Sequence, residues 1–368
     1  MSAMDLTNRD RFMRLMRGEP VDRAPFFPCF GPWPQTLARW HREGLPRDAD
    51  WRAVAGFDGA LRHKVPVNAY LCPPFERQVL EEDGEIRVVV DQRGVKKREG
   101  DDGWTWAFLE HPVTDRASWE RLKPRLDPLA DGRFPDDWGL FCQNHASRTD
   151  PAYAGDLPCG FFGGPRELLG FERLVTLFYD DPGLLEEILD TLCELWVSVF
   201  TRALRDAPVE FFFIWEDMCY KGGPLIGPDL FRQYLLPRYL RLVAALREAG
   251  VDMFMVDSDG DPRLLIPLWL EAGVTCLFPW ETQMGLDITA VRRQYPGLQM
   301  IGGIDKHRLA LGREAIDEEL VKVPFMLQSG RYLPAVDHFV PPDVSWDNYR
   351  YFCERLRDLI ERYPPGPT

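Results

Sequence analysis

The sequence predicts a single (β/α)8 barrel, an α/β fold in which parallel strands alternate with helices. Five short apolar runs in the second half of the chain each end at an acidic residue, and a helix-like stretch follows each run. These runs and acids are Phe211–Trp215 with Glu216 and Asp217, Met253–Val256 with Asp257 and Asp259, Val274–Phe278 with Glu281, Met300–Ile304 with Asp305, and Tyr332–Val336 with Asp337. Continuous apolar runs of this length are typical of buried parallel strands. The 368 residues, 45% of them hydrophobic, suffice for one barrel.

The first half of the chain supplies the other predicted elements. Residues 5–18 have the pattern of an amphipathic helix that stops at Gly18, and Phe26–Phe30 predicts the first strand. Short alternating runs punctuated by glycine predict a β-hairpin insertion at 76–108. A surface segment, a strand that leads into a helix, and a long helix are expected at 112–150, 158–165 and 183–205. No repeat or linker divides the chain, so we expect one domain over residues 1–368.

Composition excludes some classes of partner. The net charge is −14 and the sequence pI is about 5.0, which argues against nucleic acid or an anionic membrane. No run approaches the roughly 18 apolar residues of a membrane span, and residues 1–19 lack a signal-peptide core. The eight cysteines include no C-x-x-C pair and are interpreted as reduced thiols. These features predict a cytoplasmic protein.

The acidic strand ends predict an active site. In a closed barrel the carboxyl ends of the strands meet at one face, and that face carries the catalytic groups. Because desolvated like charges repel, several carboxylates at one mouth are more typical of catalysis than of stability. The candidate catalytic residues are Glu216, Asp217, Asp257, His338 and Arg166. We expect Asp257 and His338 side by side, and Arg166 either contacts an anionic substrate or pairs with a mouth acid.

Aromatic and acidic side chains near the same strand ends are candidates for substrate binding. They could form an apolar wall for a flat molecule, although part of the set would serve the core. The candidates are Phe30, Trp33, Trp215, Tyr220, Glu281 and Asp337. Gly163 and Gly164, which precede a helix, could cradle an anion or form only a turn.

Several stretches resemble the uroporphyrinogen decarboxylase (URO-D) superfamily, which also contains the cobalamin (corrinoid) methyltransferases. The similar stretches are Thr7–Phe12, Arg17–Arg23, Gly163–Glu172, Gly302–Lys306 and Asp337–Val344. They occur in the family's order through almost the whole chain. The resemblance implies a TIM barrel, often dimeric, so a homodimer is a further expectation.

The departures from that family indicate the branch. True decarboxylases carry an Arg-Gln-Ala-Gly-Arg stretch after the first strand, whose cations receive substrate carboxylates, but here Phe30–Pro34 contains no cation. The decarboxylases' active-site tyrosine falls at Arg166. A porphyrinogen with many carboxylates requires several fixed cations. Uroporphyrinogen is therefore not the expected substrate, and the corrinoid methyltransferase branch is favoured.

Comparison with that branch suggests a metal site. Its members bind zinc through a His-x-Cys-Gly strand end and a later cysteine, and the matching positions here hold Asp257, Asp259 and His338. Carboxylates with one imidazole suit Zn²⁺, Mn²⁺ or Fe²⁺ and an oxygen-bearing substrate. The resemblance thus implies a divalent metal, zinc in the first instance. The alternative is that the metal is gone and the two aspartates act as bases or hydrogen-bond acceptors.

Three functions follow from these observations. The first is a metal-assisted methyltransferase that works with a corrinoid protein on a small O- or N-methyl substrate. The second is a decarboxylase or related lyase acting on a small carboxylic acid or a tetrapyrrole-related substrate, with Arg166 holding a carboxylate. The third, a non-catalytic binder of a corrinoid or tetrapyrrole, fits poorly with so many converging ionisable groups.

Overall fold

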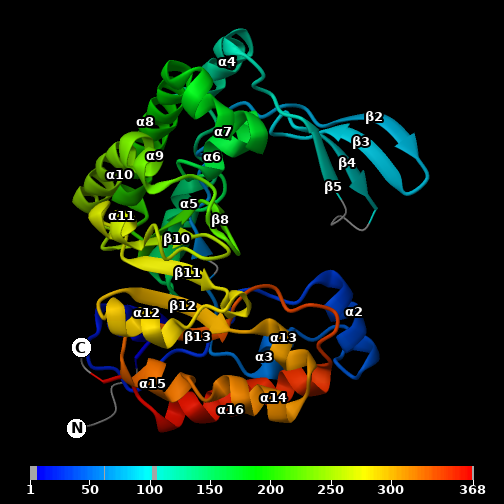
Figure 1. Ribbon diagram of the computed structural model, residues 1–368, viewed down its shortest axis with the longest axis vertical. Helices are drawn as coiled ribbons and strands as arrows, with labels where there is room; N and C mark the ends of the chain where they lie inside the picture. Colours follow the sequence, from blue (N-terminus) through cyan, green and yellow to red (C-terminus); the bar gives the residue numbers. More distant parts are fainter. Residues whose placement is uncertain (1–5, 62, 102–105, 367–368) are drawn as a thin grey trace.

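A computed structural model describes residues 6–61, 63–101 and 106–366, and its central feature is a parallel sheet whose strands follow chain order (Figure 1). In the described residues its seven strands are, in spatial order, β1 (His63–Lys64), β6 (Ala152–Gly155), β7 (Phe211–Trp215), β10 (Met253–Asp257), β11 (Cys276–Trp280), β12 (Gln299–Ile304) and β13 (Tyr332–Val336). Every neighbouring pair is parallel. The predicted TIM-barrel architecture is confirmed.

The first predicted strand, Phe26–Phe30, does not form a regular strand. Instead Pro32 makes an isolated parallel bridge with Val340, just beyond β13. Trp33 N–H donates to the Val340 carbonyl at 3.2 Å, and Val340 N–H donates to Gly31 at 3.1 Å. Prolines lack the N–H that a ladder needs, so this segment takes the eighth position beside β13 without a continuous ladder.

The barrel has a seam between this segment and β1. Among the described residues no ladder pairs the two, and Phe26 is bonded instead to Asp58, which precedes β1 in the chain. Asp58 N–H donates to the Phe26 carbonyl at 3.0 Å, and its carboxylate accepts from Phe26 N–H at 2.9 Å and from Arg23 at 2.6 Å. Phe26 is thus held by bonds to Asp58 and not by a strand partner.

Helices cover the sheet. The helices that precede β7 are α1 (Asn8–Arg17), α2 (Pro34–Arg42), α3 (Trp51–Ala55), α4 (Arg116–Leu122), α5 (Trp138–Ala146), α6 (Gly163–Leu169), α7 (Phe171–Asp180) and α8 (Pro182–Asp206). Later ones are α9 (Pro228–Leu230), α10 (Leu236–Glu248), α11 (Ile266–Glu271), α12 (Ile288–Gln294), α13 (Lys306–Ala310), α14 (Arg313–Leu320), α15 (Val323–Gln328) and α16 (Trp346–Arg362). Helix α1 ends at Gly18, whose φ of 71° suits glycine. None of the described helices combines the length and hydropathy needed to cross a bilayer.

One prediction between residues 112 and 165 was wrong. The segment 112–150 lies largely at the surface, as expected, and contains α4 and α5, but the strand predicted at 158–165 is a turn that leads into α6. The strand that precedes α6 is β6, whose centre lies eight residues before the centre of the predicted strand. Pro158 and three nearby glycines favour the turn over a strand.

The insertion is a four-stranded antiparallel sheet and not a single hairpin. Its strands are β2 (Gln78–Asp83), β3 (Ile86–Val90), β4 (Lys96–Gly100) and β5 (Trp106–Glu110), paired in that order. Residues 102–105, which include the predicted Gly103 break, lie outside the described residues. Figure 1 shows the sheet projecting away from the barrel body. The predicted antiparallel insertion is thus larger than expected and ends at Glu110.

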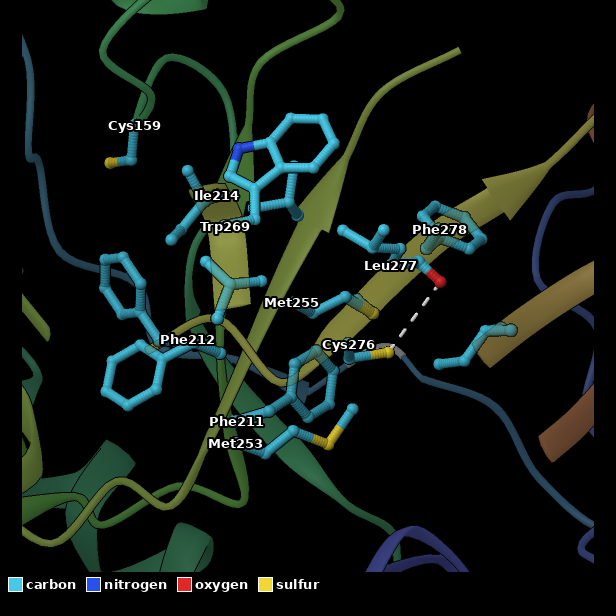
Figure 2. Close-up of a cluster of buried hydrophobic side chains, with 14 of the residues drawn as sticks. Cys159, Phe211, Phe212, Ile214, Met253, Met255, Trp269, Cys276, Leu277 and Phe278 are labelled. Atoms are coloured by element: carbon cyan, nitrogen blue, oxygen red, sulfur yellow. Dashed lines mark hydrogen bonds between the residues drawn. The ribbon is translucent and has the colours of Figure 1, made fainter. Parts of the chain in front are cut away.

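The barrel strands carry a continuous apolar core. Phe211, Phe212 and Ile214 of β7 pack with Met253 and Met255 of β10, all of them buried (Figure 2). Burying a side chain of this size stabilises the fold by about 1.5–3 kcal/mol. The near-continuous apolar strands therefore reflect burial on both faces of the sheet.

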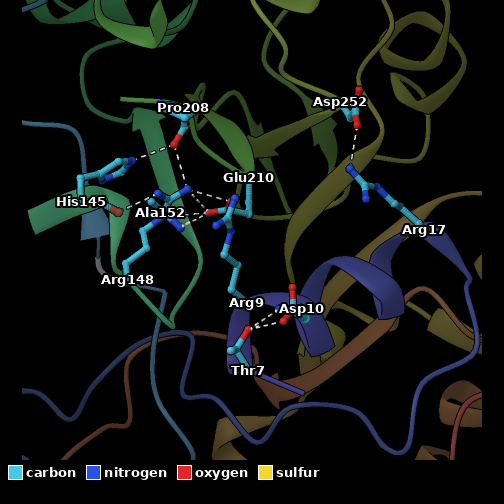
Figure 3. Close-up of polar contacts among 10 residues, drawn as sticks. All are labelled: Thr7, Arg9, Asp10, Arg17, His145, Arg148, Ala152, Pro208, Glu210 and Asp252. Carbon is cyan, nitrogen blue, oxygen red and sulfur yellow. Dashed lines mark hydrogen bonds and ion pairs between the residues drawn. The ribbon is translucent and has the colours of Figure 1, made fainter. Parts of the chain in front are cut away.

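A second, polar cluster ties the N-terminal helix to the amino end of the barrel (Figure 3). The buried carboxylate of Glu210, which directly precedes β7, accepts from Arg9 at 2.5 Å, from Arg148 at 2.8 Å and from Ala152 N–H at 2.7 Å. Arg148 also donates to the Pro208 carbonyl at 2.8 Å. The charge of Glu210 is therefore fully compensated.

Candidate functional site

Carboxylates from four strands meet at the carboxyl end of the barrel. Asp217 follows β7, Asp257 is the last residue of β10, Glu281 follows β11 and Asp337 follows β13. Asp259 lies two residues beyond β10. The strand-end pattern therefore located these five acids at one mouth.

Asp257 and Asp259, at and just beyond the end of β10, both have raised pKa values. Burial, together with repulsion from Asp259 and Asp217, raises the pKa of Asp257 well above its usual range. Burial and the carboxylate of Glu281 raise the pKa of Asp259 to about 7. Both groups therefore hold protons more tightly than ordinary aspartates, as expected of functional carboxyl groups.

Lys306, at the start of α13, is a site residue that our sequence analysis did not assign. Its ammonium lies 3.0 Å from Glu281 Oε1 and 3.6 Å from Asp337 Oδ1. Glu281 also accepts from Gly260 N–H at 3.0 Å. Burial raises the pKa of Glu281, but Gly260 and Lys306 outweigh it, so the net pKa is lowered. Burial raises the pKa of Asp337 to about 7 despite Lys306.

His338 lies against an aromatic cluster and faces Asp259. Its Nε2 is 3.6 Å from Asp259 Oδ2, and its ring stacks on Phe30 with the centroids 4.5 Å apart. Phe30 also stacks on Phe278 at 5.0 Å. Burial and the charge of Lys306 lower the pKa of His338, so the imidazole is neutral near pH 7. The described partner is Asp259, where we expected Asp257.

Arg166 pairs with a mouth acid. Its guanidinium donates to the carboxylate of Asp217 at 2.6 Å and to the Asp217 carbonyl at 2.8 Å, and it lies 4.9 Å from the Trp215 ring centroid. The sequence had left open whether Arg166 contacts a substrate anion or a mouth acid. In this structure its charge is matched by Asp217.

Glu216 is a structural carboxylate, so the predicted catalytic role does not fit its placement. The side chain is fully buried and accepts from the N–H groups of Phe161, Phe162 and Gly163 at 2.7, 2.6 and 2.9 Å. Tyr239 O–H donates to the same group. A Cβ on Gly163 would lie 2.3 Å from the Trp215 carbonyl, so only glycine allows this approach. The acidic group cradled before α6 is the protein's own Glu216, and burial raises its pKa.

The remaining substrate-binding candidates lie at the rim of the mouth. Trp33 caps α2 and is 36% exposed, and Tyr220 is 53% exposed on the two-residue strand β8 (Cys219–Tyr220), which pairs with β9 (Gly223–Pro224). Gly260 packs so closely on Tyr220 that an added Cβ would lie 2.6 Å from its backbone. Trp33 and Tyr220 are therefore the two exposed aromatic residues of the predicted substrate-binding set.

The predicted metal ligands do not form a metal site in this arrangement. Within the described residues, no group of three or more His, Cys, Asp or Glu side chains is placed to hold a metal ion. Asp259 and His338 are near each other, with Nε2 of His338 3.6 Å from Oδ2 of Asp259, which is longer than a hydrogen-bonded contact. The residues present do not fit the implied zinc, and the metal stays a prediction.

A cavity of about 630 Å³ adjoins the acidic mouth. It lies between the insertion sheet, helices α6 and α7, and the end of β7. Its lining residues are Arg93, Lys97, Trp106, Phe108, His111, Leu157, Arg166, Glu167, Phe171, Trp215 and Asp217. Trp215 and Asp217 thus belong to both the cavity and the mouth.

Known proteins resemble the chain over nearly its full length. The URO-D family, described as uroporphyrinogen decarboxylase, matches residues 107–359. A uroporphyrinogen decarboxylase of Alkalilimnicola ehrlichii is 24% identical over 98% of this chain and 96% of its own length, and one from Saccharophagus degradans is 23% identical over 98% and 99%. A methyltransferase from Methanosarcina mazei has the same fold, with a TM-score of 0.60, 15% identity, and coverage of 96% of this chain and 100% of its own.

Proposed function

Because this chain belongs to the uroporphyrinogen decarboxylase (URO-D) family, we propose that it is a methyltransferase that moves a methyl group from an oxygen- or nitrogen-linked substrate to a corrinoid on a partner protein. The observation that carries this proposal is Asp257, a buried carboxyl group among other carboxylates, at a mouth whose described cations are already paired. These surroundings raise the pKa of Asp257 well above its usual range, so it holds its proton to a higher pH than an ordinary aspartate. A protonated carboxyl at a strand end can act as a general acid.

The chain's residues supply proton transfer and positioning. As the bond between the methyl group and a substrate oxygen breaks, Asp257 donates its proton to that oxygen. Asp259, with a pKa of about 7, and neutral His338 at 3.6 Å from it can return a proton to the site. The corrinoid, when bound, supplies the nucleophile that accepts the methyl group. The exposed rings of Trp33 and Tyr220 at the rim fit the flat face of such a group.

No step of this proposal involves a metal. Protonation by Asp257 stabilises a leaving oxygen in the way that a Lewis acid otherwise would. This replaces the metal-assisted scheme that the family resemblance suggested.

Decarboxylation is the second candidate, because a protonated Asp257 could also deliver a proton to a carbanion. The described cations favour it less. Arg166 is paired with Asp217, and Lys306 lies between Glu281 and Asp337. A substrate with many carboxylates would have to displace these acids, and the segment Phe30–Pro34 adds no cation. Uroporphyrinogen therefore fits this mouth poorly.

The test is methyl transfer from a panel of O- and N-methyl compounds to a reduced corrinoid protein. The change in absorbance of the corrinoid reports the transfer. Asp257→Asn should lower kcat by about 10²–10⁴-fold, the usual contribution of a general acid. Asp305→Asn is the matched control, because Asp305 also follows a strand but caps α13, where asparagine caps equally well. Equal rates in wild type and Asp257→Asn would refute the proposal, and so would turnover of uroporphyrinogen at the rate of an authentic decarboxylase.

A further inference from the structure

A buried ammonium group joins the ends of three neighbouring strands at the mouth. Lys306 begins α13, just beyond β12, and is only 9% exposed. Its Nζ lies 3.0 Å from Glu281 Oε1, beyond β11, and 3.6 Å from Asp337 Oδ1, beyond β13. Its backbone N–H also donates to Asp337 at 3.2 Å. Because a buried charge is stable only when it is paired and hydrogen-bonded, these contacts hold the lysine side chain in one position.

The Glu281 carboxylate connects Lys306 to the loop that follows β10. Its Oε2 accepts from the Gly260 N–H at 3.0 Å. Its Oε1 accepts from Lys306 at 3.0 Å and from the Gln283 side chain at 3.1 Å. One oxygen thus faces the lysine and the other faces the loop. The carboxylate cannot rotate away from Gly260 without also breaking its bond to Lys306.

The loop held in this way carries the acids assigned to proton transfer. It begins at Asp257, the last residue of β10, and includes Asp259. Its turn is made by Gly260, whose φ is 76° and where an added Cβ would lie 2.6 Å from the Tyr220 backbone, so only glycine fits. Glycine has no side chain that could restrain such a turn. The position of Asp259 therefore depends on the bond from the Gly260 N–H to Glu281.

We propose that Lys306 is a positioning residue, which keeps the Glu281 carboxylate on the Gly260 N–H and so fixes the loop after β10. Its effect on catalysis rests on the proposed function, whereas its effect on the loop does not. Without the ammonium group the carboxylate would lose its charged partner and turn toward water at the mouth, which would release Gly260. Because the lysine acts through Glu281 and does not touch the substrate, its removal should lower kcat and leave KM nearly unchanged.

Hydrogen–deuterium exchange of the full chain, combined with the methyl-transfer assay, tests this role. In Lys306→Met the Gly260 amide should exchange about tenfold faster than in wild type, because its acceptor is released. The kcat should fall about 100-fold, as expected when a catalytic group is misplaced, and KM should change by no more than about twofold. Lys123→Met is the matched control, because Lys123 also pairs with a glutamate, Glu187 of α8, at 2.8 Å, and neither residue belongs to the mouth.

A double variant shows whether Lys306 acts through Glu281. Glu281→Ala should accelerate Gly260 exchange and lower kcat, and Lys306→Met/Glu281→Ala should be no more impaired than Glu281→Ala alone. The double variant contains neither charge of the pair, so this comparison also serves if Lys306→Met alone does not fold. Additive losses in the double variant would overturn the proposal. An effect of Lys306→Met on KM alone would also overturn it, because that result would mean direct contact with the substrate.

The outcomes separate this role from the proposed function. Faster Gly260 exchange in Lys306→Met, in a protein that transfers no methyl group, would refute the proposed function and leave the restraint of the loop by Lys306 standing. A lower kcat with unchanged Gly260 exchange would overturn the positioning role and leave the proposed function standing.

Discussion

The two ends of the barrel treat buried carboxylates in opposite ways. At the amino end, Glu210 is held by Arg9, Arg148 and the Ala152 N–H (Figure 3). At the carboxyl end, Asp257 has Asp259, Asp217, Asp156 and Glu281 as its charged neighbours. The ion-paired carboxylate of Glu210 stabilises the fold, whereas the neighbouring carboxylates of Asp257 raise its pKa. Stability and reactivity are thus separated along the barrel axis.

The largest effect should come from breaking the amino-end cluster. Glu210→Gln leaves Arg148, with its side chain 4% exposed, without a counter-charge. Losing one partner of a buried pair costs about 3–5 kcal/mol, and urea unfolding would measure this loss. Asp347→Asn, which removes an exposed partner of Arg313, is the control and should have little effect. An unchanged unfolding free energy in Glu210→Gln would mean that the cluster is not a stabilising lock.

Replacing a carboxylic acid by its amide at the carboxyl end of the barrel should change stability in the opposite direction. Asp257→Asn puts a neutral amide where the protein already favours a neutral acid. We expect a Tm at pH 8 equal to or above that of wild type, because ionisation of Asp257 no longer opposes folding. Differential scanning calorimetry of both proteins would measure it. A clearly lower Tm would place Asp257 among the structural carboxylates, beside Glu216.

Asp259 should make stability depend on pH. Its pKa is raised from 3.8 to about 7 in the folded chain. A raised carboxyl pKa stabilises the fold fully below the unfolded value, and this contribution is lost as pH rises from about 4 to about 7. The Tm of wild type should therefore decrease more between pH 5 and pH 8 than the Tm of Asp259→Asn. Parallel Tm curves for the two proteins would contradict the assignment.

The smallest expected effect concerns metal content. Because Asp257, Asp259 and His338 are not grouped as metal ligands, we expect His338→Ala and wild type, both without a histidine tag, to contain equal metal by elemental analysis. About one divalent ion per wild-type chain that disappears in His338→Ala and on acidification would restore the metal site predicted from the family resemblance.

The sequence predicted the barrel and much of the mouth because both depend on local patterns. Apolar runs that end in an acid placed Asp217, Asp257, Glu281 and Asp337 correctly. The same pattern also marked Asp305, whose side chain accepts from His307 N–H at 2.8 Å and only caps α13. A strand-end acid has the same sequence signature in either role.

Other features depend on contacts between distant segments. Glu216 and Asp217 are adjacent, yet one lies beneath the loop before α6 and the other pairs with Arg166 at the mouth, because the chain leaves β7 at Trp215 and turns at Asp217, whose φ is 43°. Lys306 follows β12 like an ordinary first-turn residue, and only the folded chain brings it to Glu281. The cavity combines β5 with α7 and β7, which no local pattern connects.

The seam at Asp58 has a consequence for how the barrel fluctuates. Among the described residues, the segment at 26–34 has no ladder on either side, only the bridge from Pro32 to Val340 and the bonds to Asp58, so it can move out of the ring without breaking a ladder. Amide hydrogens near Phe26 and β1 should then exchange with deuterium earlier than those of β7 and β10. Because Phe30 of this segment stacks on His338, the weakly paired part of the ring is also a wall of the mouth, and its opening would control how quickly large molecules enter.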